Sequence, residues 1–117
     1  MPQKQRVAAA QAAYYLASGA APLLSRRAFE AVTGHKREWW LVQTVGLVVL
    51  VVGGTLGSAA RAGRVTPEVV GLGAGSAVAL GAIDVFHAGR GRISPVYLVD
   101  AAFQGVCVAG WLRAVRS

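Results

Sequence analysis

The stretch WWLVQTVGLVVLVVGGTL at residues 39–56 carries no charged side chain. An apolar run of about 18 residues is long enough to cross the hydrocarbon core of a bilayer as a helix. A helix is required there because lipid offers no hydrogen-bond partner for backbone N–H and C=O groups. Similar apolar runs lie at about 7–24, 69–86 and 96–112. The sequence therefore predicts one all-α membrane domain over residues 1–117, a bundle of four transmembrane helices with short loops.

The composition of the chain agrees with lipid as its solvent. Hydrophobic residues make up 55% of the chain and charged residues 15%. Soluble domains carry about 25% charged residues, so this chain has too few to cover a surface that faces water. The net charge of +7 would suggest nucleic-acid binding in a soluble protein. Here the basic residues flank apolar runs, where they contact phospholipid headgroups. We therefore expect a cell-membrane protein with membrane lipids as partners and no nucleic acid.

Capping residues mark the expected helix starts. Thr66-Pro67 is typical of a first turn, since Thr caps the helix and Pro fits its first position. Ser94-Pro95 predicts the same start for the fourth span. Together these two motifs favour helical hairpins with short connections.

Residues 25–33 predict a short helix that lies in the membrane interface. Ser25 would cap this helix and Gly34 would stop it. One face would then carry Arg26, Arg27 and Glu30 toward water, and the other Ala28, Phe29 and Val32 toward lipid.

The distribution of charged residues between the two sides bears on membrane orientation. With four spans, the side of the termini carries Lys4, Arg6, Arg61, Arg64, Arg113 and Arg116, and the other side Arg26, Arg27, Lys36, Arg37, Arg90 and Arg92. The number of basic residues is equal, so it decides nothing. Of the acids, only Glu68 lies on the terminal side, which therefore has the larger net positive charge. This favours both termini in the cytoplasm.

Small residues recur at a spacing of four, which lets helix backbones approach closely. The stripes are Gly53 and Gly57; Gly73, Ala77 and Gly81; Gly71, Gly75 and Ala79; and Ala101, Gly105 and Ala109. We expect them to serve tight helix packing, including a homodimer through the third span.

Aromatic residues fall into two groups. Trp39, Trp40, Phe86 and Tyr97 lie at the level of one membrane interface and Trp111 at the other, as in an aromatic belt. Tyr14 and Tyr15 fall near the middle of the first span, where a buried hydroxyl group needs a hydrogen-bond partner.

Polar residues gather on the side of the bundle away from the termini. They are His35, Arg37, Glu38, Asp84, His87, Arg90, Arg92 and Asp100. Asp84 and His87 are three apart and share a helix face. Asp100 lies about one turn inside the fourth span. An ionisable residue inside a membrane is a candidate functional residue.

Further polar residues lie inside the apolar runs, at helical spacing. They are Tyr97, Asp100, Gln104 and Cys107; Gln11, Tyr15 and Ser18; and Gln43 and Ser76. Because a polar group facing lipid is costly, we expect these side chains to point into the bundle. The predicted ligand-binding residues are Tyr14, Tyr15, Gln43, Asp84, His87, Tyr97, Asp100 and Gln104. This polar seam predicts a protein that binds, or helps to transport, a lipid or other hydrophobic small molecule.

Three other interpretations stay open. In an intramembrane enzyme such as an isomerase, the catalytic residues would be His87 and Asp100 as the proton-transfer pair, with Asp84 orienting His87. In a structural subunit, the small-residue stripes would dock on another membrane protein. Finally, the two aspartates would be purely structural if they paired with Arg90 and Arg92.

Two patterns in the sequence look like metal or cofactor motifs. Carboxylate–histidine pairs with the spacing of helix-bundle metal sites are Asp84 with His87 and His35 with Glu38, and Glu30 and Asp100 would complete a shell. Two such pairs arise easily, so we predict no metal. GLGAGS at 71–76 looks like a dinucleotide motif but lies inside an apolar run with no strand before it. We therefore predict no cofactor.

Three stretches carry a resemblance to known proteins: WWLVQTVG at 39–46, AIDV at 82–85 and RISPVYLVD at 92–100. Together they resemble small bacterial four-helix integral membrane proteins that are DoxX-like in size. The resemblance implies a four-helix fold over most of the chain, and it brings no established activity with it.

Overall fold

The computed structural model describes residues 2–34, 38–91 and 96–116, and all regular secondary structure within these ranges is α-helical. In chain order the helices are α1 (Gln3–Leu24), α2 (Arg26–Thr33), α3 (Trp39–Ala62), α4 (Pro67–Gly89) and α5 (Tyr97–Arg116). The predicted all-α class is therefore confirmed.

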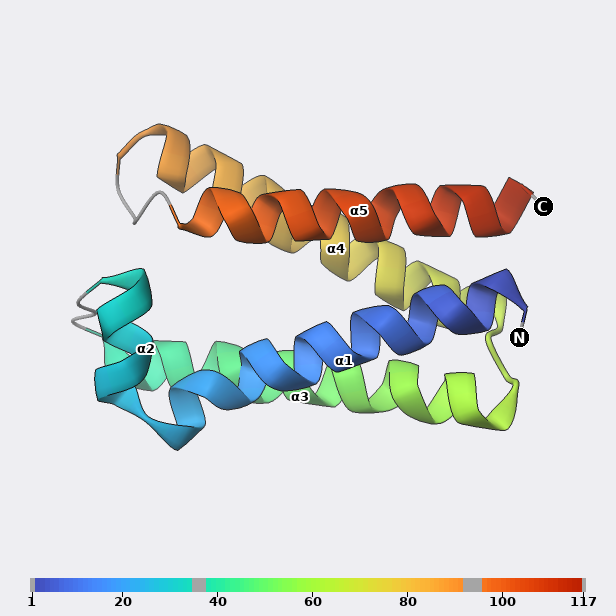
Figure 1. Ribbon diagram of the computed structural model, residues 1–117, viewed down its shortest axis with the longest axis horizontal. Coiled ribbons are helices and arrows are strands. Elements are labelled where there is room, and N and C mark those ends of the chain that lie inside the picture. The colour runs from blue at the N-terminus through green and yellow to red at the C-terminus, as the bar shows by residue number, and fades with distance from the viewer. Residues whose placement is uncertain (1, 35–37, 92–95, 117) are drawn as a thin grey trace.

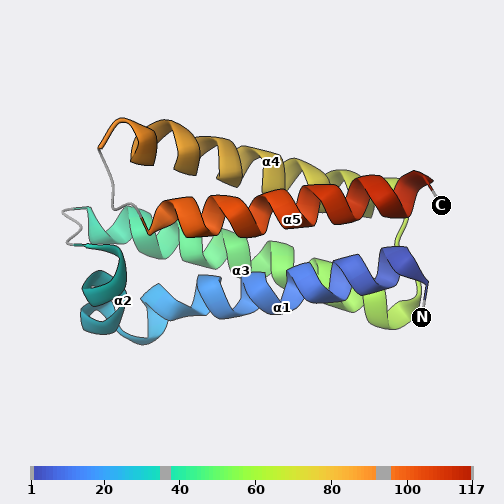
Figure 2. The same ribbon diagram turned by 45° about the horizontal axis from the view of Figure 1, so that its top comes forward.

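The four long helices lie side by side, and the short α2 lies at one end of them (Figures 1 and 2). The N- and C-termini lie together at the opposite end (Figure 1). We call these the α2 end and the terminal end. The molecule is 42 Å long, which matches the roughly 40–45 Å of a bilayer with its headgroup regions. By length and composition, α3, α4 and α5 can each cross a membrane.

Helix α1 is long enough to span a bilayer but less apolar than the other three long helices, and it is not among the candidate spans. Its interior contains Gln11, Tyr14, Tyr15, Ser18 and Pro22. At the same time, α1 contacts all four other helices. The lower apolarity of α1 thus reflects side chains that interact with protein.

The outer surface of the bundle is apolar along α3, α4 and α5. Val51 and Val106 are 68% and 69% exposed, and Leu47 and Ile83 are also more than half exposed. An apolar surface this extensive is unusual for a soluble monomer and suits contact with acyl chains.

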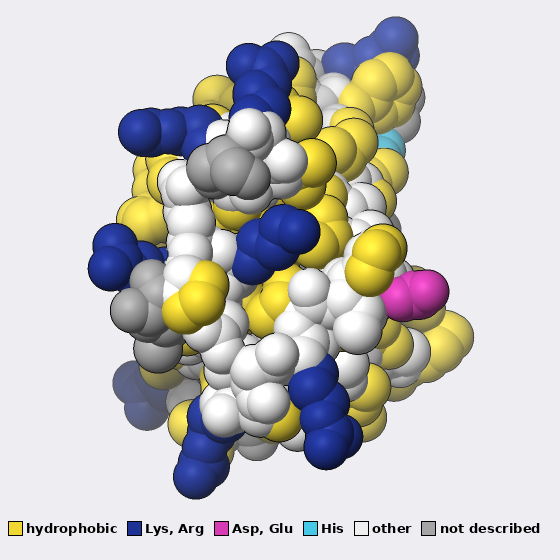
Figure 3. Space-filling model, turned by 90° about the vertical axis from the view of Figure 1, so that its right-hand side faces the viewer, with side chains coloured by type: hydrophobic (Ala, Val, Ile, Leu, Met, Phe, Trp, Pro, Cys, Tyr) yellow, Lys and Arg dark blue, Asp and Glu magenta, His cyan; other side chains and the backbone are white. Residues whose placement is uncertain are grey.

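Basic side chains surround the terminal end (Figure 3). The exposed ones there are Lys4, Arg6, Arg61, Arg64, Arg113 and Arg116. Such side chains suit the anionic headgroup region of a membrane.

The predicted helix caps are present. The Ser25 hydroxyl accepts a hydrogen bond from the Ala28 N–H at 3.1 Å, and α2 ends at Gly34, which has a φ of +93°. The Thr66 hydroxyl accepts from the Val69 N–H at 3.3 Å at the start of α4. The predicted positions of α2 and of the start of α4 are therefore confirmed.

Three helices extend beyond their predicted ends, and α4 does so by continuing to Gly89. Helix α3 continues to Ala62, where Gly63 adopts the left-handed conformation with φ +67° and ends it. Helix α5 continues to Arg116. The Ser94-Pro95 start predicted for the fourth span lies outside the described residues.

Glycines allow α1 and α3 to pack closely. A Cβ atom added to Gly46 would lie 2.7 Å from the Gly19 carbonyl oxygen, and one added to Gly53 would lie 3.0 Å from the Tyr15 Cβ. The predicted packing role of the Gly53 stripe is confirmed. Helix α1 therefore pairs with α3 along most of its length (Figure 1).

Helices α4 and α5 form the second close pair. Gly73 lies against the indole ring of Trp111, and a Cβ atom added to Gly81 would lie 3.2 Å from the Cβ of Gln104. This confirms a packing role for the stripe that contains Gly73. In contrast, Gly71, Gly75 and Gly105 have no atom of the described residues within 4 Å of an added Cβ, so these three glycines make no close helix contact there.

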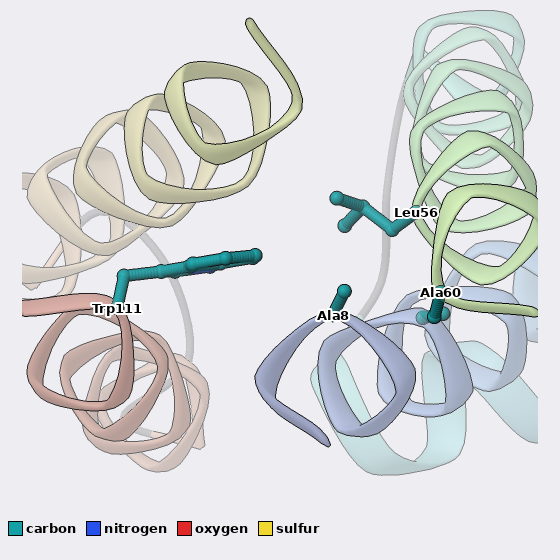
Figure 4. Close-up of a cluster of buried hydrophobic side chains, with 5 residues drawn as sticks. Ala8, Leu56, Ala60 and Trp111 are labelled. Atoms are coloured by element: carbon teal, nitrogen blue, oxygen red, sulfur yellow. The ribbon is translucent and has the colours of Figure 1, made fainter. Parts of the chain in front are cut away.

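The two helix pairs meet at the terminal end through a buried hydrophobic cluster (Figure 4). Trp111 of α5 points across toward Ala8 of α1 and Leu56 of α3 (Figure 4). Trp111 is only 1% exposed, so its prediction as an interfacial belt residue is wrong. The reason is that α5 runs on to Arg116, which places Trp111 more than one turn inside the bundle.

Candidate functional site

Hydrogen bonds between α1 and α5 cross the middle of the bundle. The Tyr14 hydroxyl donates to Asp100 Oδ1, and the buried Tyr15 hydroxyl donates to Gln104 Oε1 at 2.7 Å. The ring of Tyr14 also stacks on Phe103, with 4.9 Å between ring centroids. The expectation that both tyrosine hydroxyls have partners is confirmed. These contacts fix the position of the Asp100 carboxyl group.

Gln11 joins both halves of the bundle nearer the terminal end. Its side-chain amide donates to the Gly73 carbonyl of α4 at 2.9 Å, and its Oε1 accepts from the Trp111 indole N–H at 2.6 Å. Gln11 is fully buried. As expected, it points into the bundle, but its donor and acceptor atoms are taken up by these contacts, so it serves as a structural link.

A cavity of about 300 Å³ lies between the two helix pairs at the α2 end. Its wall contains four of the predicted site residues, namely Asp84, Tyr97, Asp100 and Gln104. The rest of the wall comprises Ser18, Gly19, Pro22, Phe29, Leu41, Val42, Val45, Gly46, Val49 and Leu80. The structure therefore brings a few polar groups together on one side of a mostly apolar chamber.

Asp84 is the unusual residue of this cavity. It is 7% exposed, and its buried Oδ2 atom has no hydrogen-bond partner in the part of the chain that the structure describes. Its neighbour is the Asp100 carboxyl group, which lies within hydrogen-bonding reach. A buried carboxyl oxygen without a partner costs free energy. Such an atom in a cavity wall is therefore a candidate ligand contact.

The purely structural role considered for the two aspartates required them to pair with arginines. Arg90 instead places its guanidinium group over the ring of Phe86, with 4.6 Å from Cζ to the centroid. Among the described residues, no ion pair joins Arg90 to Asp84 or Asp100. Pairing with Arg90 is therefore wrong for this structure, and Arg92 lies outside the described residues.

Four predicted site residues are not part of the cavity wall: Tyr14 and Tyr15, which bond to Asp100 and Gln104, and Gln43 and His87. Gln43 is exposed on α3, so the expectation that it points into the bundle is wrong. The inner face of α3 is set by Gly46 and Gly53, which pack against α1, and Gln43 falls beside that face. His87 is half-buried, lines no part of the cavity, and packs its ring edge-on against Phe86.

The expected catalytic constellation is therefore only partly assembled. Asp84 and Asp100 meet, but no hydrogen bond between Asp84 and His87 occurs within the described ranges. The same ranges contain no group of three or more His, Cys, Asp or Glu side chains arranged to hold a metal ion. His35, which entered the metal interpretation, lies outside them.

Helix α2 contributes a wall residue that sequence reasoning placed wrongly. Phe29 was expected to face lipid, but it is half-buried and lines the cavity. Its ring packs edge-on against Trp39, with 5.8 Å between centroids. Phe29 and Ser18 also line a second, almost wholly apolar pocket of about 430 Å³ between α1 and α2. Phe29 is thus part of the wall of both the cavity and the pocket beside α2.

Pro22 and Gly19 are wall residues that the sequence analysis did not single out. Pro22 has no N–H, so it cannot donate to the Ser18 carbonyl as a helical residue would. A proline so close to the end of an apolar helix could have indicated that the last turn of α1 lacks a regular helical hydrogen bond. Together with Gly46, these residues let α1 and α3 approach closely beside the cavity.

Comparison of the chain with protein-family models, with curated proteins and with solved structures gave no match.

Proposed function

We propose that this protein binds a lipid or another hydrophobic small molecule in the cavity at the α2 end. The observation that carries the proposal is a chamber of about 300 Å³ inside the bundle whose apolar wall bears a few convergent polar groups. This combination is typical of small-molecule sites, where apolar walls supply affinity and polar groups fix orientation.

The second pocket supports access from the membrane. It lies between α1 and α2, exposes almost no polar surface, and shares Ser18 and Phe29 with the cavity. Rotation of the Phe29 side chain would join the two spaces. A lipophilic molecule could then pass from the interfacial region into the cavity without crossing water.

We also propose that α1 spans the membrane, so that all four long helices do. Helix α1 is as long as the candidate spans and lies within the same bundle. Its polar side chains, including Gln11, Tyr14 and Tyr15, bond to α4 and α5 and need not face lipid. This agrees with the resemblance to small four-helix membrane proteins.

Cysteine labelling tests the span and its orientation. In a Cys107→Ala background, Lys4→Cys and Ser25→Cys place single thiols just before and just after the apolar part of α1. A membrane-impermeant maleimide should label them from opposite sides of sealed vesicles, with Lys4→Cys on the cytoplasmic side. Labelling of both from one side would show that α1 does not span.

Native mass spectrometry of gently extracted protein tests the binding function. We expect the wild-type protein to retain a lipid or small molecule, and Val49→Phe to lose it, because Val49 lines the cavity. The control is Val48→Phe, which adds the same bulk at a neighbouring position that is 57% exposed. The proposal fails if the wild-type protein retains nothing or if Val49→Phe retains as much.

A further inference from the structure

The two carboxyl groups of the cavity differ in what surrounds them. Asp100 accepts hydrogen bonds from the Tyr14 hydroxyl and, at 3.4 Å, from the Gln104 amide. Asp84 lies beside Asp100, is 7% exposed, and keeps its Oδ2 atom without a partner among the residues described. One carboxyl group is thus held in place by hydrogen bonds, and the other belongs to the cavity wall with a buried oxygen that has no described partner.

A neutral ligand would leave this pair poorly compensated. Two adjacent carboxyl groups in an apolar setting repel each other when both are ionised, and an uncompensated buried charge is costly. A cation placed against both groups removes the repulsion, and its positive charge offsets the cost of burying the carboxylates. The described residues provide no such cation, since Arg90 stacks on Phe86.

We infer that the cavity takes a lipophilic organic cation, an amine or a quaternary ammonium compound, with its charged group against Asp84 and Asp100. This inference rests on the proposed binding function and names the chemical class of its ligand. The apolar body of the ligand would lie against wall residues such as Val45, Val49 and Leu80.

The wall favours an organic cation over a metal ion. Calcium needs six to eight oxygen ligands and magnesium near-ideal octahedral coordination, whereas most of this wall is aliphatic or aromatic. The rings of Phe29 and Tyr97 belong to the wall as well. Aromatic faces beside a carboxylate are a recurring way to bind alkylammonium groups.

A matched pair of probes separates charge from shape. Benzyltrimethylammonium and neopentylbenzene have the same shape, but the second has a carbon atom in place of the charged nitrogen. Binding of labelled benzyltrimethylammonium to the full chain in detergent micelles is measured by equilibrium dialysis against empty micelles. We expect saturable binding that neopentylbenzene competes for at least about tenfold less effectively, because it lacks the charge that contacts the carboxylates.

Variants of single acidic residues test whether Asp84 is the group that recognises the charge of the probe. Asp84→Asn should weaken binding of benzyltrimethylammonium at least about tenfold, while Asp84→Glu, which keeps the charge, should bind more tightly than Asp84→Asn. Glu38→Gln is the control, because it removes an exposed acid at the same end of the molecule. Val49→Phe should block the probe by filling the cavity. Helical content and elution volume show that each variant is folded.

Several results would overturn the inference. Equal competition by neopentylbenzene would show that charge is not recognised, and this comparison uses only the wild-type protein. Unchanged binding in folded Asp84→Asn, or an equal loss in Glu38→Gln, would also overturn it. If the wild-type protein still retained a molecule that Val49→Phe lost, the proposed binding function would stand and only the cationic class would fall.

Discussion

The terminal end and the α2 end of the bundle are built from the same four long helices, yet their interiors differ. At the terminal end, Trp111 fills the space between the helix pairs and both side-chain groups of Gln11 are hydrogen bonded. At the α2 end, the same space is a cavity of about 300 Å³, and Asp84 keeps an oxygen without a described partner. The four helices can therefore pack tightly around buried polar groups, as they do at the terminal end. We call this the closed end and the α2 end, with its cavity, the open end. The cavity at the open end needs a separate explanation.

The comparison teaches that polar residues have two uses in this bundle. Gln11 and Tyr15 of α1 form hydrogen bonds to α4 and α5 and hold the two helix pairs together. Asp84 reaches only the like-charged Asp100 and keeps its Oδ2 atom without a described partner, so stabilisation does not account for its presence. We therefore assign the closed end to stability and the open end to binding, and the following experiments test that division.

The largest effect is expected from Trp111→Ala at the closed end. It would open a void and leave Gln11 Oε1 without its donor, costing about 3–5 kcal/mol of unfolding free energy. Unfolding in mixed SDS micelles, followed by circular dichroism, gives this quantity. The control is Leu112→Ala, since Leu112 is 54% exposed. Equal effects of the two variants would mean that the terminal end is not a packed core.

The next effect concerns the helix contact beside the open end. In Gly46→Ala the new Cβ would lie 2.7 Å from the Gly19 carbonyl oxygen, and we expect a loss of about 1–3 kcal/mol in the same unfolding assay. Gly54→Ala is the matched control on α3, because nothing lies within 4 Å of its added Cβ. It should be neutral or stabilising by up to about 1 kcal/mol. A neutral Gly46→Ala would contradict the close approach of α1 and α3.

Two further variants are expected to change the unfolding free energy in opposite directions. Asp84→Leu should stabilise the unliganded protein by about 1–2 kcal/mol, because it removes a buried carboxyl group with an open oxygen. Gln11→Leu should destabilise it, since the Trp111 N–H loses its acceptor. If Asp84→Leu were as destabilising as Gln11→Leu in the SDS assay, Asp84 would be a structural residue and the division between the ends would fail.

The smallest effect is expected from single hydroxyl groups. Tyr15→Phe removes the hydrogen bond to Gln104, and polar contacts between membrane helices contribute about 0.6 kcal/mol on average. Thr55→Val is the control, because the exposed Thr55 hydroxyl bonds only to the Val51 carbonyl of its own helix. A difference between the two variants that is indistinguishable from zero would show that this link does not hold α1 to α5.

Local features of the fold could be predicted from the sequence. Ser25 and Gly34 delimit α2, and Thr66 begins α4, because capping depends on residue type at a single position. The meeting of Asp84 and Asp100 was also foreseeable. Both lie near one end of an apolar span, and lipid excludes them from the outer surface.

Other features depended on packing that the sequence does not display. Helix α3 is apolar on all sides, so its periodicity could not show that Gln43 lies outside the face set by Gly46. Phe29 faces the cavity because of where α2 lies across the bundle. The unpartnered buried oxygen of Asp84 follows from how side chains pack around it, which no spacing rule specifies.

The hydrogen bonds of α1 also bear on how the chain is made. Gln11 and Trp111 are 100 positions apart in the sequence, and Tyr15 and Gln104 are 89 apart. The polar groups of α1, which is synthesised first, therefore lack these hydrogen bonds until α5, which is synthesised last, is present. Until α5 leaves the ribosome, α1 must stay beside the insertion machinery or in the interfacial region, because bare lipid penalises those groups. A nascent chain that stops before Tyr97 should accordingly be degraded faster in a pulse-chase experiment than the complete one.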